Sequence, residues 1–171
     1  MKSHKKTILI LIGGGGFTSE TIPLLTEIRK ENMLVFVISG GNHFDHISYE
    51  KILKCNFDDS HILTITNPAQ MIMSFPERIL SYVSNIIETI IISNSRKYDL
   101  CLGVGTFLSL FFFIVSTLKR KPCIFVETIT RADKLSNTGK IIYFLRLADK
   151  FYVYHKNLVF KYNKVTYAGI K

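Results

Sequence analysis

The residues best suited to chemistry are four consecutive glycines, Gly13–Gly16, followed by Phe17, Thr18, Ser19 and Glu20. An apolar run precedes them and a helical pattern follows, an arrangement that directs free backbone N–H groups at an anion. The spacing matches neither G-x-G-x-x-G nor a P-loop, because position 18 is threonine and no lysine follows. The negative charge of Glu20 would suit the helix dipole but repel a phosphate. These residues alone therefore leave two interpretations open, a phosphate or sugar cradle and a structural strand-to-helix turn.

Two further polar segments, Gly103–Thr106 and Glu127–Lys140, also follow apolar runs. In parallel sheets, ligands bind beyond the carboxyl ends of the strands, where such segments meet. Each segment alone could be ordinary turn chemistry. Three that converge on one edge favour a binding site.

Six short apolar runs predict the strands that would position these segments. They cover residues 7–12, 33–38, 62–65, 97–102, 122–126 and 151–154. Helical spacing predicts helices over residues 22–28 and 76–94, with a short one at 48–53. Continuous apolar strands that alternate with helices are typical of a parallel sheet covered on both faces. We therefore predict an α/β fold, with one Rossmann-like, doubly wound, mostly parallel sheet forming a single domain over residues 1–171.

The net charge of +9 fits a nucleic acid, an anionic membrane or an acidic substrate, and equally a solvated basic surface. The three cysteines have no C-x-x-C spacing, which favours buried, reduced thiols. The histidines form no metal-binding pattern, so no metal site is predicted.

The segment 107–118 is apolar on all sides. A helix buried under the sheet is one interpretation. The other is contact with lipid, assisted by basic residues near acidic headgroups, which would involve Phe107, Phe111, Phe112, Lys119 and Arg120. The stretch is too short to span a bilayer, so we expect no transmembrane helix in this chain.

The run from Glu127 to Lys140 resembles the E-S-x-x-R-x-x-x-L-S-x-T-G-K signature of the Alg-type split N-acetylglucosaminyltransferases. The similarity is to their membrane-side, acceptor-binding subunit, whose relatives include bacterial exopolysaccharide and capsule glycosyltransferase subunits. Residues 14–20, 99–106 and 167–169 resemble other motifs of the family in matching order, so the resemblance covers residues 8–169. Phe17 departs from the family, which has histidine at that position.

The resemblance implies half of a GT-B glycosyltransferase, which is active only with a partner chain. The partner, similar to the C-terminal half, would hold the UDP-sugar, and this chain would bind no cofactor. This chain would bind a polyprenyl-diphosphate-linked acceptor, recruit the partner to the membrane and take part in transfer of N-acetylglucosamine, or of another hexose in a bacterial complex. The expected location is the cytosolic face of a membrane, the endoplasmic reticulum in a eukaryote or the inner or plasma membrane in a bacterium.

The resemblance also implies roles for individual residues. The predicted contacts to the acceptor diphosphate are Gly14, Gly15, Gly16, Phe17, Thr18, Gly103, Gly105, Thr106, Arg131 and Lys140. Glu127 is the candidate catalytic base, or else a brace that pairs with Arg131. The predicted organisers of the loops are Glu20, Thr128, Ser136, Thr138 and Gly139, and the predicted partner contacts are Tyr167, Ala168, Gly169, Ile170 and Lys171.

Two other classes of protein remain as alternatives. A self-sufficient nucleotide-binding Rossmann enzyme would carry an acidic residue about 20 positions beyond the glycines, where this chain has Ser39, Gly40 and Gly41. A nucleic-acid-binding module would group its lysines along one helix, whereas here they are scattered. We therefore expect no nucleic-acid partner.

Overall fold

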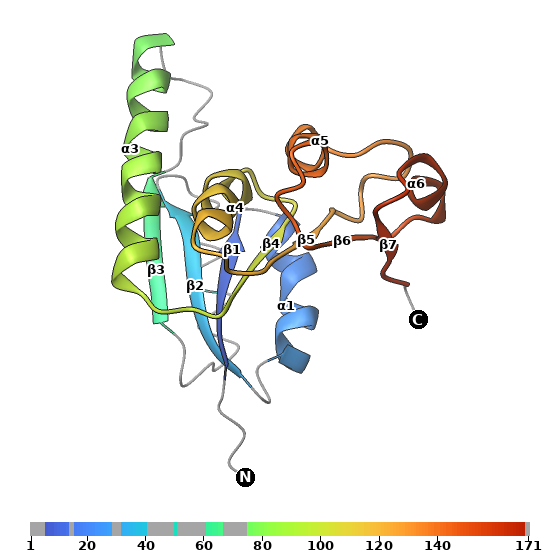
Figure 1. Cartoon of the computed structure of the whole chain (residues 1–171), viewed down its shortest axis with the longest axis horizontal. Helices are drawn as coiled ribbons and strands as arrows, with labels where there is room; N and C mark the ends of the chain where they lie inside the picture. The colour runs from blue at the N-terminus through green and yellow to red at the C-terminus, as the bar shows by residue number, and fades with distance from the viewer. Residues whose placement is uncertain are drawn as a thin grey trace.

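The computed structural model describes residues 6–13, 16–28, 32–40, 50, 61–66 and 75–169. Seven strands form one sheet in the order β3-β2-β1-β4-β5-β6-β7 (Figure 1), and each pairs in parallel with its neighbours. The strands are β1 Lys6–Ile12, β2 Asn32–Gly40, β3 His61–Thr66, β4 Leu100–Val104, β5 Cys123–Val126, β6 Lys150–Val153 and β7 Thr166–Tyr167. The described helices are α1 Gly16–Ile28, α3 Phe75–Ser95, α4 Leu108–Leu118, α5 Asn137–Phe144 and α6 Lys156–Lys161. The predicted α/β class with a doubly wound, mostly parallel sheet is confirmed.

The two faces of the sheet carry separate hydrophobic cores, because side chains alternate along each strand. Leu9 and Leu11 of β1 point to the face covered by α4, α5 and α6. Ile8, Ile10 and Ile12 of the same strand point to the face covered by α1. Burial on both sides explains why the strands read as continuous apolar runs.

The strand ends differ from prediction mainly at β4, which begins at Leu100 and not at residue 97. Tyr98 turns inward before the strand begins, and its hydroxyl lies 2.9 Å from Ser116 Oγ of α4. Asp99 accepts a hydrogen bond from the Thr7 amide at 2.9 Å, which holds the chain at the start of the strand. The predicted helix at 48–53 lies almost wholly outside the described residues.

Helix α5 overlaps the segment 127–140 that was predicted as a loop, and the elements α6 and β7 were not predicted either. Helix α6 has six residues and β7 has two. Both α6 and β7 are too short for a hydrophobic period to repeat often enough to be recognised, so no sequence signal marks them. Together they complete the edge of the sheet where the described chain ends.

Candidate functional site

The loops that follow β1, β4 and β5 lie together at the carboxyl edge of the sheet, because these strands are neighbours. The strand order reverses between β1 and β4, and parallel α/β sheets bind ligands at such a reversal. The Gly105 amide donates to Val126 O at 2.9 Å, which joins the β4 turn to the end of β5. Gly14 and Gly15 lie outside the described residues, whereas Gly16 is exposed at the start of α1.

Phe17 packs against glycines of two of these turns. A Cβ atom added to Gly105 would lie 2.7 Å from Phe17 Cε1, and one added to Gly13 would lie 3.2 Å from Phe17 Cδ2. Gly105 also has a φ of 58°, in the left-handed region that favours glycine. The aromatic ring therefore fills the space between the β1 and β4 turns.

Three of the predicted acceptor contacts are buried in the structure. The side chain of Thr18 is fully buried, and its hydroxyl donates to Gly13 O at 3.4 Å. Thr106 is buried and accepts from the Leu108 amide at 3.4 Å. A Cβ on Gly103 would overlap Ser109 Oγ, so this glycine lets α4 approach β4 closely. Packing encloses these three residues in the structure, so ligand contact through them stays a prediction that this geometry does not support.

Glu20 joins α1 to the loop after β5. Its Oε1 accepts from the Thr128 hydroxyl at 2.8 Å, and its Oε2 accepts from the Ile129 amide at 3.1 Å. Hydrogen bonds to a carboxylate are stronger than those between neutral groups. The carboxylate thereby connects two segments more than a hundred residues apart in the sequence, at the edge where the candidate site lies.

The Glu127 carboxyl is completely buried at the end of β5. Its Oε1 accepts from the Thr128 amide at 3.1 Å, and its Oε2 accepts from the Ser136 amide at 2.9 Å and the Ser136 hydroxyl at 3.0 Å. Burial raises the pKa of Glu127, while hydrogen bonds from Ser136 and Thr128 and the charge of Arg131 act in the opposite direction. Because protein groups engage both oxygens, the geometry supports the brace and does not offer an accessible base. The brace is formed by Ser136 and Thr128 and not by the predicted pairing with Arg131.

Ser136 connects this brace to α5. Its hydroxyl accepts from the Gly139 amide at 2.9 Å and so caps the N-terminus of the helix. A Cβ on Gly139 would overlap Glu127 Oε2, so only glycine leaves room for the carboxylate. Thr138 is buried beside them in the first turn of α5.

Two residues that sequence reasoning did not select hold the outer side of the loop. His155 Nε2–H donates to Ile129 O at 2.6 Å, and Lys161 Nζ donates to Asp133 O at 2.7 Å. Both come from the segment between β6 and the end of α6. No sequence signal identifies them, because each binds a backbone oxygen and not a partner side chain.

The cations predicted at this edge occupy different environments. Arg131 is exposed in the loop, and its charge acts on the Glu127 carboxyl. Lys140 is half-buried in the first turn of α5, and its amide donates to Ser136 O at 2.8 Å. Within the described residues, no group of three His, Cys, Asp or Glu side chains could hold a metal ion.

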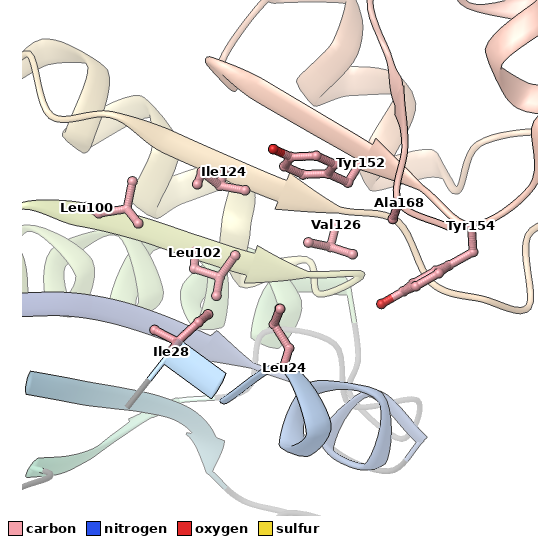
Figure 2. Close-up of a pocket in the computed structure, with 9 residues that line it drawn as sticks. All are labelled: Leu24, Ile28, Leu100, Leu102, Ile124, Val126, Tyr152, Tyr154 and Ala168. Atoms are coloured by element: carbon pink, nitrogen blue, oxygen red, sulfur yellow. The ribbon is translucent and has the colours of Figure 1, made fainter. Parts of the chain in front are cut away.

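An apolar groove of about 330 Å³ lies on the face of the sheet that carries α1. Figure 2 shows side chains of β4, β5 and β6 directed into it opposite two residues of α1, with Ala168 of the C-terminal segment at its rim. Burial raises the pKa of the Tyr154 hydroxyl at this site, and the charge of Glu20 adds to the effect. The lining residues are Leu24, Ile28, Leu100, Leu102, Ile124, Val126, Tyr152, Tyr154 and Ala168.

The predicted lipid contact through α4 is partly wrong. Phe112 is fully buried in the core, on the inward side of the helix, and cannot contact a membrane. Phe107 and Phe111 are half-buried, and Phe107 makes edge contacts with Phe111 and with Tyr82 of α3. Lys119 and Arg120 are exposed just beyond the end of α4. Of the helices that the structure describes, none combines the length and apolarity needed to cross a bilayer.

Comparison with known families finds a match over residues 8–171 to the family described as "Oligosaccharide biosynthesis protein Alg14 like". Two similar proteins carry the name UDP-N-acetylglucosamine transferase subunit ALG14. The one from Debaryomyces hansenii is 27% identical over 183 residues, covering 95% of this chain and 75% of the relative. The one from Homo sapiens is 26% identical over 178 residues, covering 95% of this chain and 82% of the relative.

Solved structures show the same fold in one half of longer glycosyltransferases. Acinetobacter baumannii MurG matches with a TM-score of 0.65 at 12% identity, over 86% of this chain and 41% of MurG. Anabaena Alr3699/HepE, solved with UDP and glucose, matches with a TM-score of 0.60 at 15% identity, over 97% of this chain and 45% of HepE. The chain thus spans less than half the length of these proteins. At this identity the similarity concerns the fold alone.

Proposed function

Because the chain belongs to the Alg14 family of oligosaccharide biosynthesis proteins, we propose that it is one subunit of a two-chain UDP-N-acetylglucosamine transferase. In this proposal it binds the polyprenyl-diphosphate acceptor, and the partner chain holds the UDP-sugar. The observation that carries the proposal is the similarity, along nearly the whole chain, to proteins named as subunits of that transferase. The fold match to about half the length of longer glycosyltransferases agrees with the size expected for one half of such an enzyme.

The acceptor diphosphate would bind at the carboxyl edge between the β1 turn and the β5 loop. The start of α1 at Gly16 and Phe17 supplies free backbone N–H groups and the positive end of a helix dipole. Arg131 and Lys140 carry positive charge at the same edge, one from the β5 loop and one from the first turn of α5. Charge-assisted contacts from these side chains would then fix the diphosphate while the sugar hydroxyl faces the partner.

Two carboxylates, half-buried Glu20 and buried Glu127, keep this edge in shape. Glu20 holds the β5 loop to α1, and Glu127 holds the two ends of the same loop together. Transfer between two bound substrates depends on their alignment, so a loop fixed at both ends favours catalysis. In this proposal Glu127 positions the acceptor loop and does not remove the proton itself.

The partner chain would dock on the groove and the C-terminal segment beside it. Tyr167 and Ala168 continue β7, and the Ala168 amide donates to Val153 O at 2.8 Å. An uncovered apolar surface next to an edge strand suits a stable interface with a second chain. Ile170 and Lys171 lie outside the described residues, and Gly169 has a φ of 63°, in the left-handed region that favours glycine. We expect Ala168→Arg to abolish co-purification with the partner, with exposed Lys164→Ala as the unaffected control.

We further propose that the complex works at the cytosolic face of a membrane, because its expected acceptor is anchored in lipid. This membrane would be the endoplasmic reticulum in a eukaryotic cell and the inner or plasma membrane in a bacterium.

The deciding experiment measures transfer of radiolabelled N-acetylglucosamine from UDP to a short-chain prenyl-diphosphate acceptor in detergent. We expect transfer only when this chain and a C-terminal-half chain are both present. Arg131→Gln should lower the rate at least about tenfold, because it removes a charge-assisted phosphate contact. Arg146→Gln is the matched control, since Arg146 is exposed at the other end of α5.

Two results would reject the proposal. One is transfer by this chain alone, which would indicate a self-sufficient enzyme. The other is a wild-type transfer rate for the double variant Arg131→Gln, Lys140→Gln. That result would show that these two cations do not bind the acceptor diphosphate. Transfer from UDP-glucose in place of UDP-N-acetylglucosamine would favour the exopolysaccharide type of subunit.

A further inference from the structure

Helix α3 presents its apolar face to solvent. Seven aliphatic side chains along the helix are exposed, with Leu80 at 71% and Ile91 at 58%. An ordinary amphipathic helix of a globular protein turns such a face toward the core. The exposed residues, here called the α3 face, are Ile79, Leu80, Val83, Ile86, Ile87, Ile90 and Ile91.

The inward face of the same helix is polar. Ser81, Asn85, Thr89 and Ser93 recur every fourth position and are all buried against the protein. Burying polar groups is costly, and burying isoleucine is favourable, so this rotation of α3 is unfavourable for the isolated chain. An apolar partner on the outer side would reverse that balance.

The apolar surface continues onto the neighbouring helix α4, which packs against α3. Leu118 is 80% exposed there, and Ile114 is also exposed. Figure 1 shows α3 at the β3 edge of the sheet, where its outer side is not covered by another labelled element. Soluble monomers rarely expose a contiguous apolar patch of more than a few hundred Å², so a surface of this kind marks an interaction site.

Positive charge gathers at one end of the α3 face. Arg96 and Lys97 follow the helix, and Lys119, Arg120 and Lys121 follow α4. The Lys119 ammonium donates to Ser93 O, which holds the second group beside the end of α3. The acidic residues of α3 lie elsewhere, Glu77 in its first turn and Glu88 on a half-buried side bonded to Ser84. An aliphatic face with a basic rim is complementary to an anionic lipid surface, which combines acyl chains with negative headgroups.

We propose that the α3 face lies in the surface of an anionic bilayer, with the helix along the interface and the basic cluster on the headgroups. This deepens the proposed function, which requires a lipid-borne acceptor. A helix that leads into a parallel strand runs antiparallel to it, so α3 begins at the carboxyl edge where the acceptor loops lie. Lipid contact through α3 therefore brings that edge to the membrane.

The test uses the absence of tryptophan from the chain. Ile87→Trp places a single fluorophore on the α3 face, and Phe160→Trp places one on α6 as the control, at a residue that is 88% exposed. Vesicles of equal parts phosphatidylcholine and phosphatidylglycerol should shift the Ile87→Trp emission to the blue, and brominated lipids should quench it. The control should show neither effect. High salt should weaken binding, because it screens the basic cluster.

A second variant separates lipid contact from folding. Ile87→Gln, Ile90→Gln and Ile91→Gln together remove the centre of the face, and glutamine is a better helix former than isoleucine. We expect vesicle partitioning to fall at least about tenfold, because the apolar area that enters the interface is lost. Phe144→Gln, on α5, should leave it unchanged.

Three outcomes would overturn the proposal. The first is unshifted Ile87→Trp emission with anionic vesicles at low salt. The second is a blue shift without lipid in a chain that sediments as a dimer, since a second copy would then cover the face. The third is a blue shift without lipid that requires the catalytic partner. The triple glutamine variant should still transfer sugar to the short-chain acceptor in detergent. Failure of the membrane-contact proposal is therefore distinguishable from failure of the proposed function.

Discussion

Replacing Gly139 with alanine tests whether the Glu127 brace determines the shape of the β5 loop. The added Cβ would overlap Glu127 Oε2 and lie 3.0 Å from Ser136 Oγ. The carboxylate must therefore move away from the Ser136 amide and hydroxyl, and the cap of α5 moves with it. Gly139 has no positive φ, so any cost comes from this overlap and not from backbone strain.

The size of the effect follows from three contributions. Hydrogen bonds to a charged group contribute about 1.5–3 kcal/mol, and these are lost. A weakened N-cap costs about 1 kcal/mol. Alanine in place of glycine within a helix returns about 1 kcal/mol, which offsets the cap. We expect a net loss of about 2 kcal/mol in the free energy of unfolding, or a Tm lower by about 4–8 °C for a chain of this size.

Urea denaturation followed by circular dichroism measures this loss, with Gly16→Ala as the matched control. A Cβ on Gly16 meets nothing within 4 Å, so that variant should be neutral or slightly stabilised. A double-mutant cycle identifies the cause. In the Glu127→Ala background the obstructing oxygen is gone, and Gly139→Ala should become neutral or stabilising. A Gly139→Ala variant as stable as the wild type, or an equal loss in both backgrounds, would refute the reasoning.

Three further predictions concern the same sheet edge and the core beneath it. Glu20→Ala should lower the free energy of unfolding by about 1.5–3 kcal/mol and reduce partner-dependent transfer, because it removes two hydrogen bonds to a carboxylate. An unchanged free energy of unfolding in urea denaturation would contradict this. The raised pKa of Glu127 means that the folded chain binds a proton more readily than the unfolded chain just above pH 4.5. The free energy of unfolding should therefore fall as pH rises through that window, and Glu127→Gln should flatten this part of a pH series of urea curves. Cys101 and Cys123 are buried, and burial raises the pKa of Cys123 to about 12. A thiol reagent at pH 8 should therefore label neither cysteine until urea is added, and peptide mapping would measure this.

Strand positions were predictable because each strand is buried on both faces. An apolar run such as Ile8–Ile12 leaves few alternatives to a central parallel strand, and glycine or polar residues after the run mark its carboxyl end. The convergence of the β1, β4 and β5 loops follows from that topology. Exact contacts within the loops did not follow, because a carboxylate such as Glu127 can pair with a cation or with backbone amides. Only the folded path brings the Ser136 amide to it.

Helix α3 shows where periodicity alone is insufficient. The spacing of Ile79, Val83, Ile86 and Ile90 predicts a helix with one apolar face, and the helix is present. The same spacing does not state which face points inward. The general preference for apolar cores would bury the isoleucines, whereas the structure buries Ser81 and its neighbours on the polar side. A polar face whose side chains are short and uncharged can pack inward. The serine, threonine and asparagine composition of this face was therefore the feature of the sequence that could have indicated its burial.

Phe112 shows the complementary error. Its segment is apolar all round, so the pattern could not distinguish the side facing the sheet from the side facing outward. The structure packs Phe112 and Phe113 inward, while Ile114 and Leu118 remain exposed. The side chains of α4 that can contact a membrane are thus Ile114 and Leu118, on the side facing α3, and not the buried Phe112 and Phe113.

The proposed acceptor edge is built mainly from braces, and this bears on where the proton acceptor for the proposed transfer lies. The two carboxylates that contact the β5 loop, Glu20 and Glu127, have all four oxygens engaged with that loop. His155 donates to the same loop from outside. Phe17 has no ionisable group and fills the space between two glycine turns. The groups that hold this edge in place are therefore bonded to the loop and do not face a substrate hydroxyl, and we expect the base to come from the partner chain across the cleft. In the proposed function, the contribution of this chain is then to position the acceptor.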